Sequence, residues 1–207
     1  MILKSLVVGP LEVNCFVLAC EQTKEGIVID PGDNVPGILD MIAEDDITVK
    51  EIVATHGHFD HIGRVKTLKE ELKVPFAIHE EDMFMVEGLV EIASFLDIDT
   101  DEAPEVDRFI QIGETVTFGN EALSVVHTPG HAPGNVTLLW PGNALVGDVL
   151  FAGSVGRTDL EGADPKVLME SIHRELMTLP DQTNVYPGHG PFTTIGNERA
   201  TNPFLQN

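Results

Sequence analysis

The stretch Thr55-His56-Gly57-His58-Phe59-Asp60-His61 places three imidazoles and one carboxylate within seven residues. It directly follows residues 47–54, an apolar run that predicts a strand, and a polar loop at a strand end is a common place for functional residues. Neutral imidazole and carboxylate groups suit Zn²⁺, Fe or Mn²⁺, and a short loop can direct alternate side chains at different ions. The stretch therefore predicts a metal site, with a solvent-exposed polar loop as the alternative interpretation.

Three further residues fit the same site. His131 lies in the run HTPGHAPG of residues 127–134, Asp148 follows an apolar run and Gly147, and His189 lies in a Pro-Gly-His-Gly-Pro loop. A single histidine at a strand end is more often a hydrogen-bonded structural residue than a ligand. Their shared position beside glycines at predicted strand ends indicates that they join the first stretch.

Turn residues divide the chain into short apolar runs with strand or helix spacing. Strands are predicted at 2–8, 13–19, 26–29, 47–54, 74–78, 115–118, 123–127, 136–140, 144–147 and 184–186. Helices are predicted at 35–44, 62–72 and 165–177, with a mostly helical, acidic region at 82–106 and a short helical tail. The pattern favours an α+β fold of two packed sheets with helices outside, in one domain over residues 1–207.

The charge balance restricts the partners. With 12 basic and 34 acidic residues, the formal net charge is −22, which opposes binding to nucleic acid and to anionic membrane surfaces. No window approaches the ~20 apolar residues of a membrane span. Cys15 and Cys20 are an odd number of residues apart in a predicted strand run, so they face opposite sides and are poorly placed for a disulfide. We expect a cytoplasmic protein.

The motifs HGHFDH, HTPGH, GD and PGHG, in this order, resemble the metal-binding pattern of the metallo-β-lactamase superfamily. The resemblance implies a four-layer αββα sandwich with two divalent metal ions at one edge, zinc first, with iron or manganese as alternatives. It implies metal 1 on His56, His58 and His131, metal 2 on Asp60, His61 and His189, and Asp148 as the bridging ligand.

Within that superfamily the chain is similar to the short glyoxalase II-like hydrolases. Asn14-Cys15-Phe16, Asp30-Pro31-Gly32, the run 150–159 and the tail 190–204 carry this similarity. It implies hydrolysis of a small-molecule thioester of the S-D-lactoylglutathione type by metal-bound hydroxide, which Asp60 would orient as the catalytic residue. The matched pattern ends before the helical domain with which full-length glyoxalase II helps bind glutathione, so the exact substrate stays open.

Two other activities of the same fold are alternatives. A persulfide dioxygenase, which uses one Fe(II) held by two histidines and an aspartate, shares an element similar to residues 156–159, but the loop 187–191 favours the hydrolases. A true β-lactamase is less favoured, because Asp148 is expected to bridge the metals.

Several residues have two interpretations. Arg157 either pairs with Asp159 or Asp164, or binds a substrate carboxylate. Asp30 either forms a turn or accepts a hydrogen bond from a metal-binding histidine, and the resemblance favours the second. His127 is interpreted as structural, and His79 and His173 as surface residues. Helix packing is expected of Met83, Phe84, Met85 and Phe95, and core packing of Trp140 and Tyr186.

Overall fold

The computed structural model describes residues 1–206, and its first sheet has the strand order β1-β2-β3-β4-β5-β6. Strands β1 to β3 pair antiparallel because short turns join them, whereas β3 to β6 pair parallel. Parallel neighbours need crossover connections, and each of the three contains at least one helix. The strands are β1 (Ile2–Val8), β2 (Val13–Ala19), β3 (Glu25–Ile29), β4 (Thr48–Val53), β5 (Phe76–Ile78) and β6 (Arg108–Phe109).

The second sheet has the order β14-β13-β10-β9-β8-β7, in which only β10 and β13 pair parallel. A small hairpin of β11 (Leu150–Phe151) and β12 (Ser154–Val155) follows β10. The sheet strands are β7 (Thr115–Phe118), β8 (Glu121–His127), β9 (Val136–Trp140), β10 (Asn143–Gly147), β13 (Asn184–Pro187) and β14 (Thr193–Thr194).

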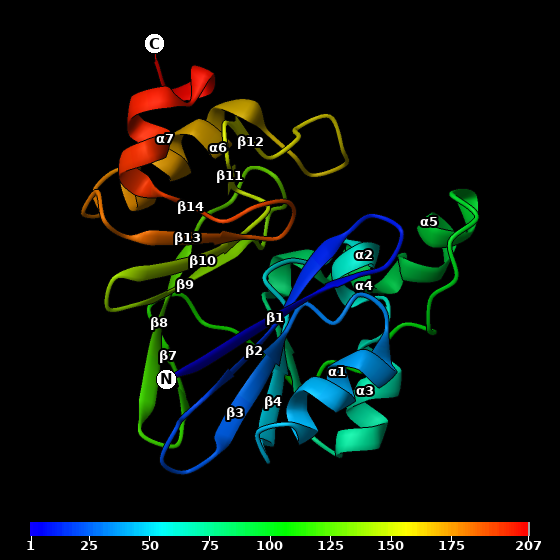
Figure 1. The fold of residues 1–207 in the computed structure, drawn as a ribbon. Coiled ribbons are helices and arrows are strands. Elements are labelled where there is room, and N and C mark those ends of the chain that lie inside the picture. Colours follow the sequence, from blue (N-terminus) through cyan, green and yellow to red (C-terminus); the bar gives the residue numbers. More distant parts are fainter. Residues whose placement is uncertain (207) are drawn as a thin grey trace.

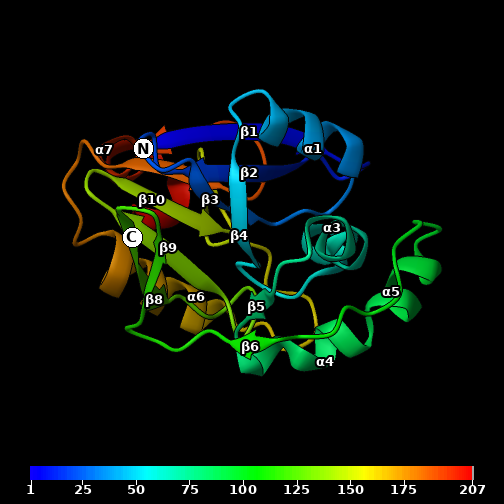
Figure 2. The same cartoon turned by 90° about the horizontal axis from the view of Figure 1, so that it is seen from below.

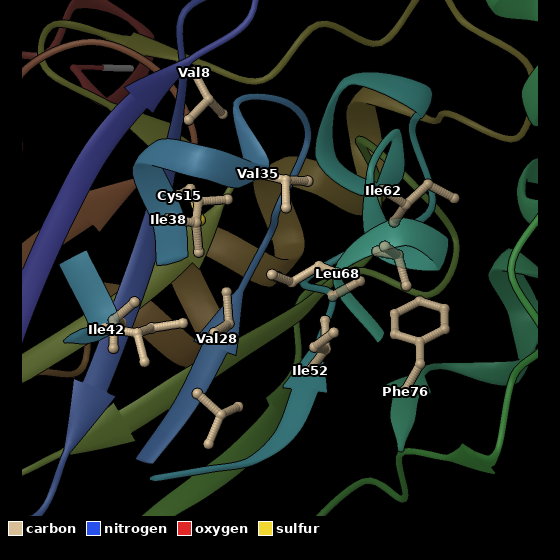
Figure 3. Close-up of a cluster of buried hydrophobic side chains, with 14 of the residues drawn as sticks. Val8, Cys15, Val28, Val35, Ile38, Ile42, Ile52, Ile62, Leu68 and Phe76 are labelled. Atoms are coloured by element: carbon tan, nitrogen blue, oxygen red, sulfur yellow. The ribbon is translucent and has the colours of Figure 1, made fainter. Parts of the chain in front are cut away.

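The two sheets face each other, and helices cover their outer faces (Figures 1 and 2). Val28 and Ile52 of the first sheet pack against Ile38 of α1 (Val35–Ala43) and Leu68 of α3 (Val65–Leu72), as Figure 3 shows. A second apolar cluster fills the space between the sheets, and a third lies under the outer helices of the second sheet. Those helices are α6 (Pro165–Ser171), η2 (Ile172–Leu176) and α7 (Ile195–Thr201), with η3 (Pro203–Leu205) after them. The predicted α+β, four-layer sandwich is confirmed.

Some predicted helices have different bounds. The helix expected at 62–72 is divided into α2 (Phe59–Ile62) and α3, with Gly63 and Arg64 between them. A Cβ at Gly63 would lie 2.7 Å from the Gly32 carbonyl oxygen, so the backbone passes the loop after β3 closely at this point. The helix expected at 165–177 widens after Ser171 into η2, which has π-helical turns.

The region 82–106 is less helical than predicted. After η1 (Glu80–Asp82) it contains α4 (Met83–Glu87) and α5 (Leu89–Phe95), and the chain then runs without helix or strand to β6. Met85 is buried, but the side chain of Phe95 is 89% exposed, so the prediction that it packs in the fold was wrong.

Both cysteines are buried and free, and Trp140 and Tyr186 pack with the cluster between the sheets, as predicted. Among residues 1–206, no helix has the length and apolarity to cross a membrane.

Candidate metal centre

The seven predicted ligands lie together at one edge of the sandwich. They come from the segment after β4, from α2, from the loop between β8 and β9, from the end of β10 and from the loop after β13. An isolated bridge between Val13 and His189, and a 2.7 Å hydrogen bond from Asn14 N to the Gly188 carbonyl, tie the last loop to the first sheet. The edge thus combines strand ends from both sheets.

Three imidazoles form the first group of inward-facing nitrogens. His58 Nδ1 lies 3.0 Å from His56 Nε2 and 2.9 Å from His131 Nε2. The rings of His56 and His131 are buried, and the potential ligand atoms of the three residues all lie within 4.8 Å of one another. This is a three-nitrogen donor set of the type that binds Zn²⁺.

Asp60, His61 and His189 form the second group. His189 Nε2 lies 3.3 Å from His61 Nε2 and 3.3 Å from Asp60 Oδ2. Asp148 stands between the groups, because its Oδ2 lies 3.5 Å from His131 Nε2 and 3.4 Å from His189 Nε2. Its other oxygen, Oδ1, is buried 3.5 Å from His61 Nε2 and has no hydrogen-bond partner among residues 1–206. One carboxylate therefore contacts both groups, and it has a free lone pair in the interior.

The outward nitrogens of four of the five imidazoles are hydrogen-bonded to groups outside the centre. His131 Nδ1 donates to the Arg157 carbonyl at 2.8 Å, and His189 Nδ1 donates to the Leu11 carbonyl at 2.8 Å. His61 Nδ1 donates to Asp30 Oδ2 at 3.0 Å. Since these contacts take the Nδ1 hydrogen, a neutral ring presents the lone pair of Nε2 to the centre.

Thr55 fixes His56 in the same way. Its hydroxyl donates to Asp30 Oδ2 at 2.7 Å, so its oxygen accepts from His56 Nδ1 at 3.0 Å. Lone pairs that face one another at about 3 Å repel unless a cation lies among them. Together with the unpaired Asp148 oxygen, this donor set fits two divalent metal ions.

The two groups differ in their protonation. Burial, followed by the positive charge that His131 would carry, lowers the pKa of His58 to about 3, and burial also lowers the pKa values of His56 and His131. In the second group burial opposes protonation, but hydrogen bonds to Asp148 and Asp60 raise the pKa of His189 to about 9. At neutral pH the first group is ready to bind a cation, whereas the second holds a proton that a cation must displace.

The structure also places the other residues of interest. Asp30 is fully buried and accepts from Thr55 N at 2.7 Å as well as from His61, as the second interpretation of it requires. The Arg157 side chain pairs with Asp159 at 2.8 Å and is 61% exposed, and a role in substrate binding stays a prediction. His173 lies in η2 on an outer helix.

His79, Glu81 and His127 make a separate group of possible ligands. The two rings stack at 4.9 Å, but His127 Nε2 contacts the Pro133 carbonyl at 2.8 Å, and Glu81 is exposed. This group is a poorer donor set than the seven-residue centre, and the His127 contact agrees with its structural interpretation.

Sequence reasoning missed Thr55 and Asp82, which contact the ligand-bearing loops. Thr55 is adjacent to the motif, and its hydroxyl was a signal that could have been used. Asp82 stands in an acidic run with Glu80 and Glu81, where nothing in the sequence marks it as fully buried.

Comparison with known proteins agrees with this geometry. The sequence model of the Metallo-beta-lactamase superfamily matches residues 8–189. A protein of Aquifex aeolicus is 43% identical over 99% of this chain and 97% of its own length. Hydroxyacylglutathione hydrolase GloC of Haemophilus influenzae is 36% identical over 96% of this chain and 95% of its own.

Three solved structures share the fold along almost the whole chain. BLEG-1 B3 metallo-beta-lactamase has a TM-score of 0.92 and 35% identity, with all of both chains covered. TTHA1623 in a di-iron-bound form has a TM-score of 0.90 and 39% identity, covering 98% of this chain and 100% of that one. ETHE1 from Myxococcus xanthus has a TM-score of 0.81 and 28% identity, covering 98% of this chain and 84% of that one.

Proposed function

The chain belongs to the metallo-beta-lactamase superfamily, and from this premise we propose that it is a two-metal hydrolase of small thioesters of the S-D-lactoylglutathione type. The observation that carries the proposal is the shared carboxylate of Asp148, which contacts one histidine of each ligand group. A 36% identical relative named hydroxyacylglutathione hydrolase supports the substrate class. The di-iron form of TTHA1623 supports two metals, of which zinc, iron and manganese are the candidates.

When bound, two divalent ions at this centre would polarise a carbonyl oxygen and lower the pKa of water to about 7. His56, His58 and His131 would hold one ion, and Asp60, His61 and His189 the other, with Asp148 between them.

Asp60 has a second task in the proposal. Its side chain is 15% exposed, and its Oδ2 already lies within 3.3 Å of His189, so it can accept a hydrogen from the attacking water and orient it. A thiol leaving group has a pKa of about 8.5 and departs as thiolate, so no general acid is required. These two features make a thioester a suitable substrate for this set of residues.

The test measures several reactions on one preparation of known metal content. S-D-lactoylglutathione, other thioesters, lactones and a β-lactam are assayed for hydrolysis, and glutathione persulfide is assayed for oxygen uptake. We expect thioester hydrolysis at about two metals per chain. A persulfide dioxygenase is the second candidate, because the chain shares its fold with ETHE1. Oxygen uptake with one iron per chain and no thioester hydrolysis would establish that activity instead.

Asp148→Ala is the decisive variant, because it removes the carboxylate that contacts both groups. We expect loss of the metal pair and of hydrolysis. Glu170→Ala is the matched control, since it removes an exposed carboxylate on α6 whose only ion pair is with Lys166 among residues 1–206. Full activity in Asp148→Ala would contradict the proposal.

A further inference from the structure

Asp82 connects the two loops that carry the first ligand group. It is the last residue of η1 and is fully buried. Its Oδ2 accepts a hydrogen bond of 2.9 Å from Gly57 N, and its Oδ1 accepts one of 2.6 Å from Gly134 N. Gly57 stands between His56 and His58, and Gly134 is three residues after His131. A single carboxylate thus accepts hydrogen bonds from both loops that carry the three imidazoles.

The backbones approach this carboxylate so closely that neither position has room for a side chain. A Cβ at Gly134 would lie 2.7 Å from Asp82 Cγ, and a Cβ at Gly57 would lie 2.9 Å from Met85 Cβ and 3.0 Å from Asp82 Cβ. Distances below about 3.0 Å require something to move. Glycine at position 134 is therefore fitted to Asp82, and glycine at position 57 to Asp82 and Met85 together.

A carboxylate in this place is costly. Burial raises the pKa of Asp82 to about 6, against the effect of its two hydrogen bonds, and no cationic side chain among residues 1–206 contributes to its stabilisation. A buried carboxylate without a cation beside it is unfavourable, so the two backbone hydrogen bonds must offset its burial. An asparagine would avoid the charge, but only one of its two polar side-chain atoms accepts, and its NH₂ would face a backbone N–H. Two acceptor oxygens are what this junction requires.

We propose that Asp82 is a positioning residue that fixes the His56–His58 loop against the His131 loop and thereby sets the geometry of the first metal site. His58 Nδ1 and His131 Nε2, which lie 2.9 Å apart, come from these two loops. At the strand ends beside the loops, a 2.9 Å hydrogen bond from Val136 N to the Thr55 carbonyl also joins the two segments. Among residues 1–206, Asp82 has no hydrogen bond to the second group, where Asp30 accepts from His61 of α2 and the Leu11 carbonyl accepts from His189. The proposal rests on the proposed metal centre and is independent of the substrate.

The test is Asp82→Asn with Co²⁺ and Zn²⁺ as probes and without substrate. The metal-free protein is titrated with Zn²⁺ against a chromophoric chelator, and with Co²⁺ while its visible spectrum is recorded. We expect a 10- to 100-fold weaker first site, a changed Co²⁺ spectrum and little change at the second site. Asp82→Glu, which keeps both acceptor oxygens, should recover part of the first-site affinity. Glu80→Gln is the control, because Glu80 is an exposed acid of the same short helix.

Two results would overturn the proposal. The first is wild-type affinity at both sites in folded Asp82→Asn, and the second is an equal weakening of both sites, which would indicate a general structural role. If Asp82→Asn does not fold, Gly134→Ala tests the same contact from the opposite side, and wild-type first-site affinity there would equally reject it. Metal binding without thioester hydrolysis would count against the proposed function alone.

Discussion

Replacement of Asp30 by asparagine should weaken the second metal site selectively. Asp30 has a φ of 54°, in the left-handed region that asparagine also tolerates, so Asp30→Asn changes one oxygen to NH₂ with little backbone strain. One oxygen can still accept from Thr55 N, which lies 2.7 Å from Oδ1. The NH₂ group then faces His61 Nδ1, which lies 3.0 Å from Oδ2, and two donors meet where a donor and an acceptor met before.

The magnitude follows from that lost acceptor. Removal of the partner of a ligating histidine typically weakens metal affinity 10- to 100-fold, which is about 1.4 to 2.8 kcal/mol. The metal-free fold should lose a further ~1–3 kcal/mol of unfolding free energy, because His61 Nδ1 is buried and loses its acceptor. Chelator competition measures the first quantity, and denaturant unfolding of the metal-free protein measures the second.

The control is Asp33→Asn in the same loop, where the side chain is 37% exposed and its ion pair with Arg64 is 3.6 Å long. We expect wild-type metal affinity for this variant. If Asp30→Asn bound the second metal as tightly as the wild type, Asp30 would not be the residue that orients the His61 ring.

Further predictions concern the same edge. Gly188→Ala should lose bound metal while the fold persists, because a Cβ there overlaps Asp148 Oδ1 and lies 2.6 Å from His61 Cε1; wild-type metal content would contradict this. Filling the second site at pH 7.5 should release at least one proton, since the pKa of His189 is about 9 in the metal-free protein and nearby carboxylates raise that of His61 as well, against the effect of burial. Calorimetry in buffers of different ionisation enthalpy measures this release. The raised pKa of His189 stabilises the metal-free fold below pH 6.5, and the contribution is lost as pH rises through 9; His189→Asn should flatten this part of the unfolding curve. Arg157→Gln should keep its metals, because His131 contacts only the main-chain carbonyl of Arg157. It should raise KM for thioesters that carry a carboxylate. An unchanged KM would mean that the Arg157 side chain only pairs with Asp159.

The sequence predicts the ligands of this centre better than the groups that orient them. Each of the seven ligands stands beside a glycine or within the histidine-rich stretch at a strand end, so local pattern and chemistry coincide. Asp82 has no such mark, because an acid in an acidic run is ordinarily exposed, and its burial depends on the approach of Gly134 from a distant part of the chain. The sequence cannot mark the Leu11 and Arg157 carbonyls as acceptors for His189 and His131, since every residue has a main-chain oxygen.

The helix boundaries also depend on contacts between distant parts of the chain, which the sequence pattern does not show. Apolar spacing at 62–72 is helical, but the helix breaks at Gly63, where a Cβ would lie 2.7 Å from the Gly32 carbonyl oxygen in the loop after β3. In 82–106 the apolar spacing is helical only as far as α5, and the packing of the remaining residues against α3 is not encoded by periodicity. Arg64 and Thr67 contact Asp101 there, and those contacts join residues more than 30 positions apart.

The two halves of the centre are chemically unequal although they share Asp148. The first group is three imidazoles that burial keeps neutral, and the outward nitrogens of His56 and His131 have hydrogen-bond partners in Thr55 and the Arg157 carbonyl. The second contains Asp60 and a histidine that holds a proton at neutral pH. A cation entering the first group displaces no proton, whereas one entering the second must do so and gains in return the charge of a carboxylate. The first group should therefore fill over a wide pH range, and the second should be the site whose occupancy, and with it hydrolysis, falls as the solution becomes more acidic.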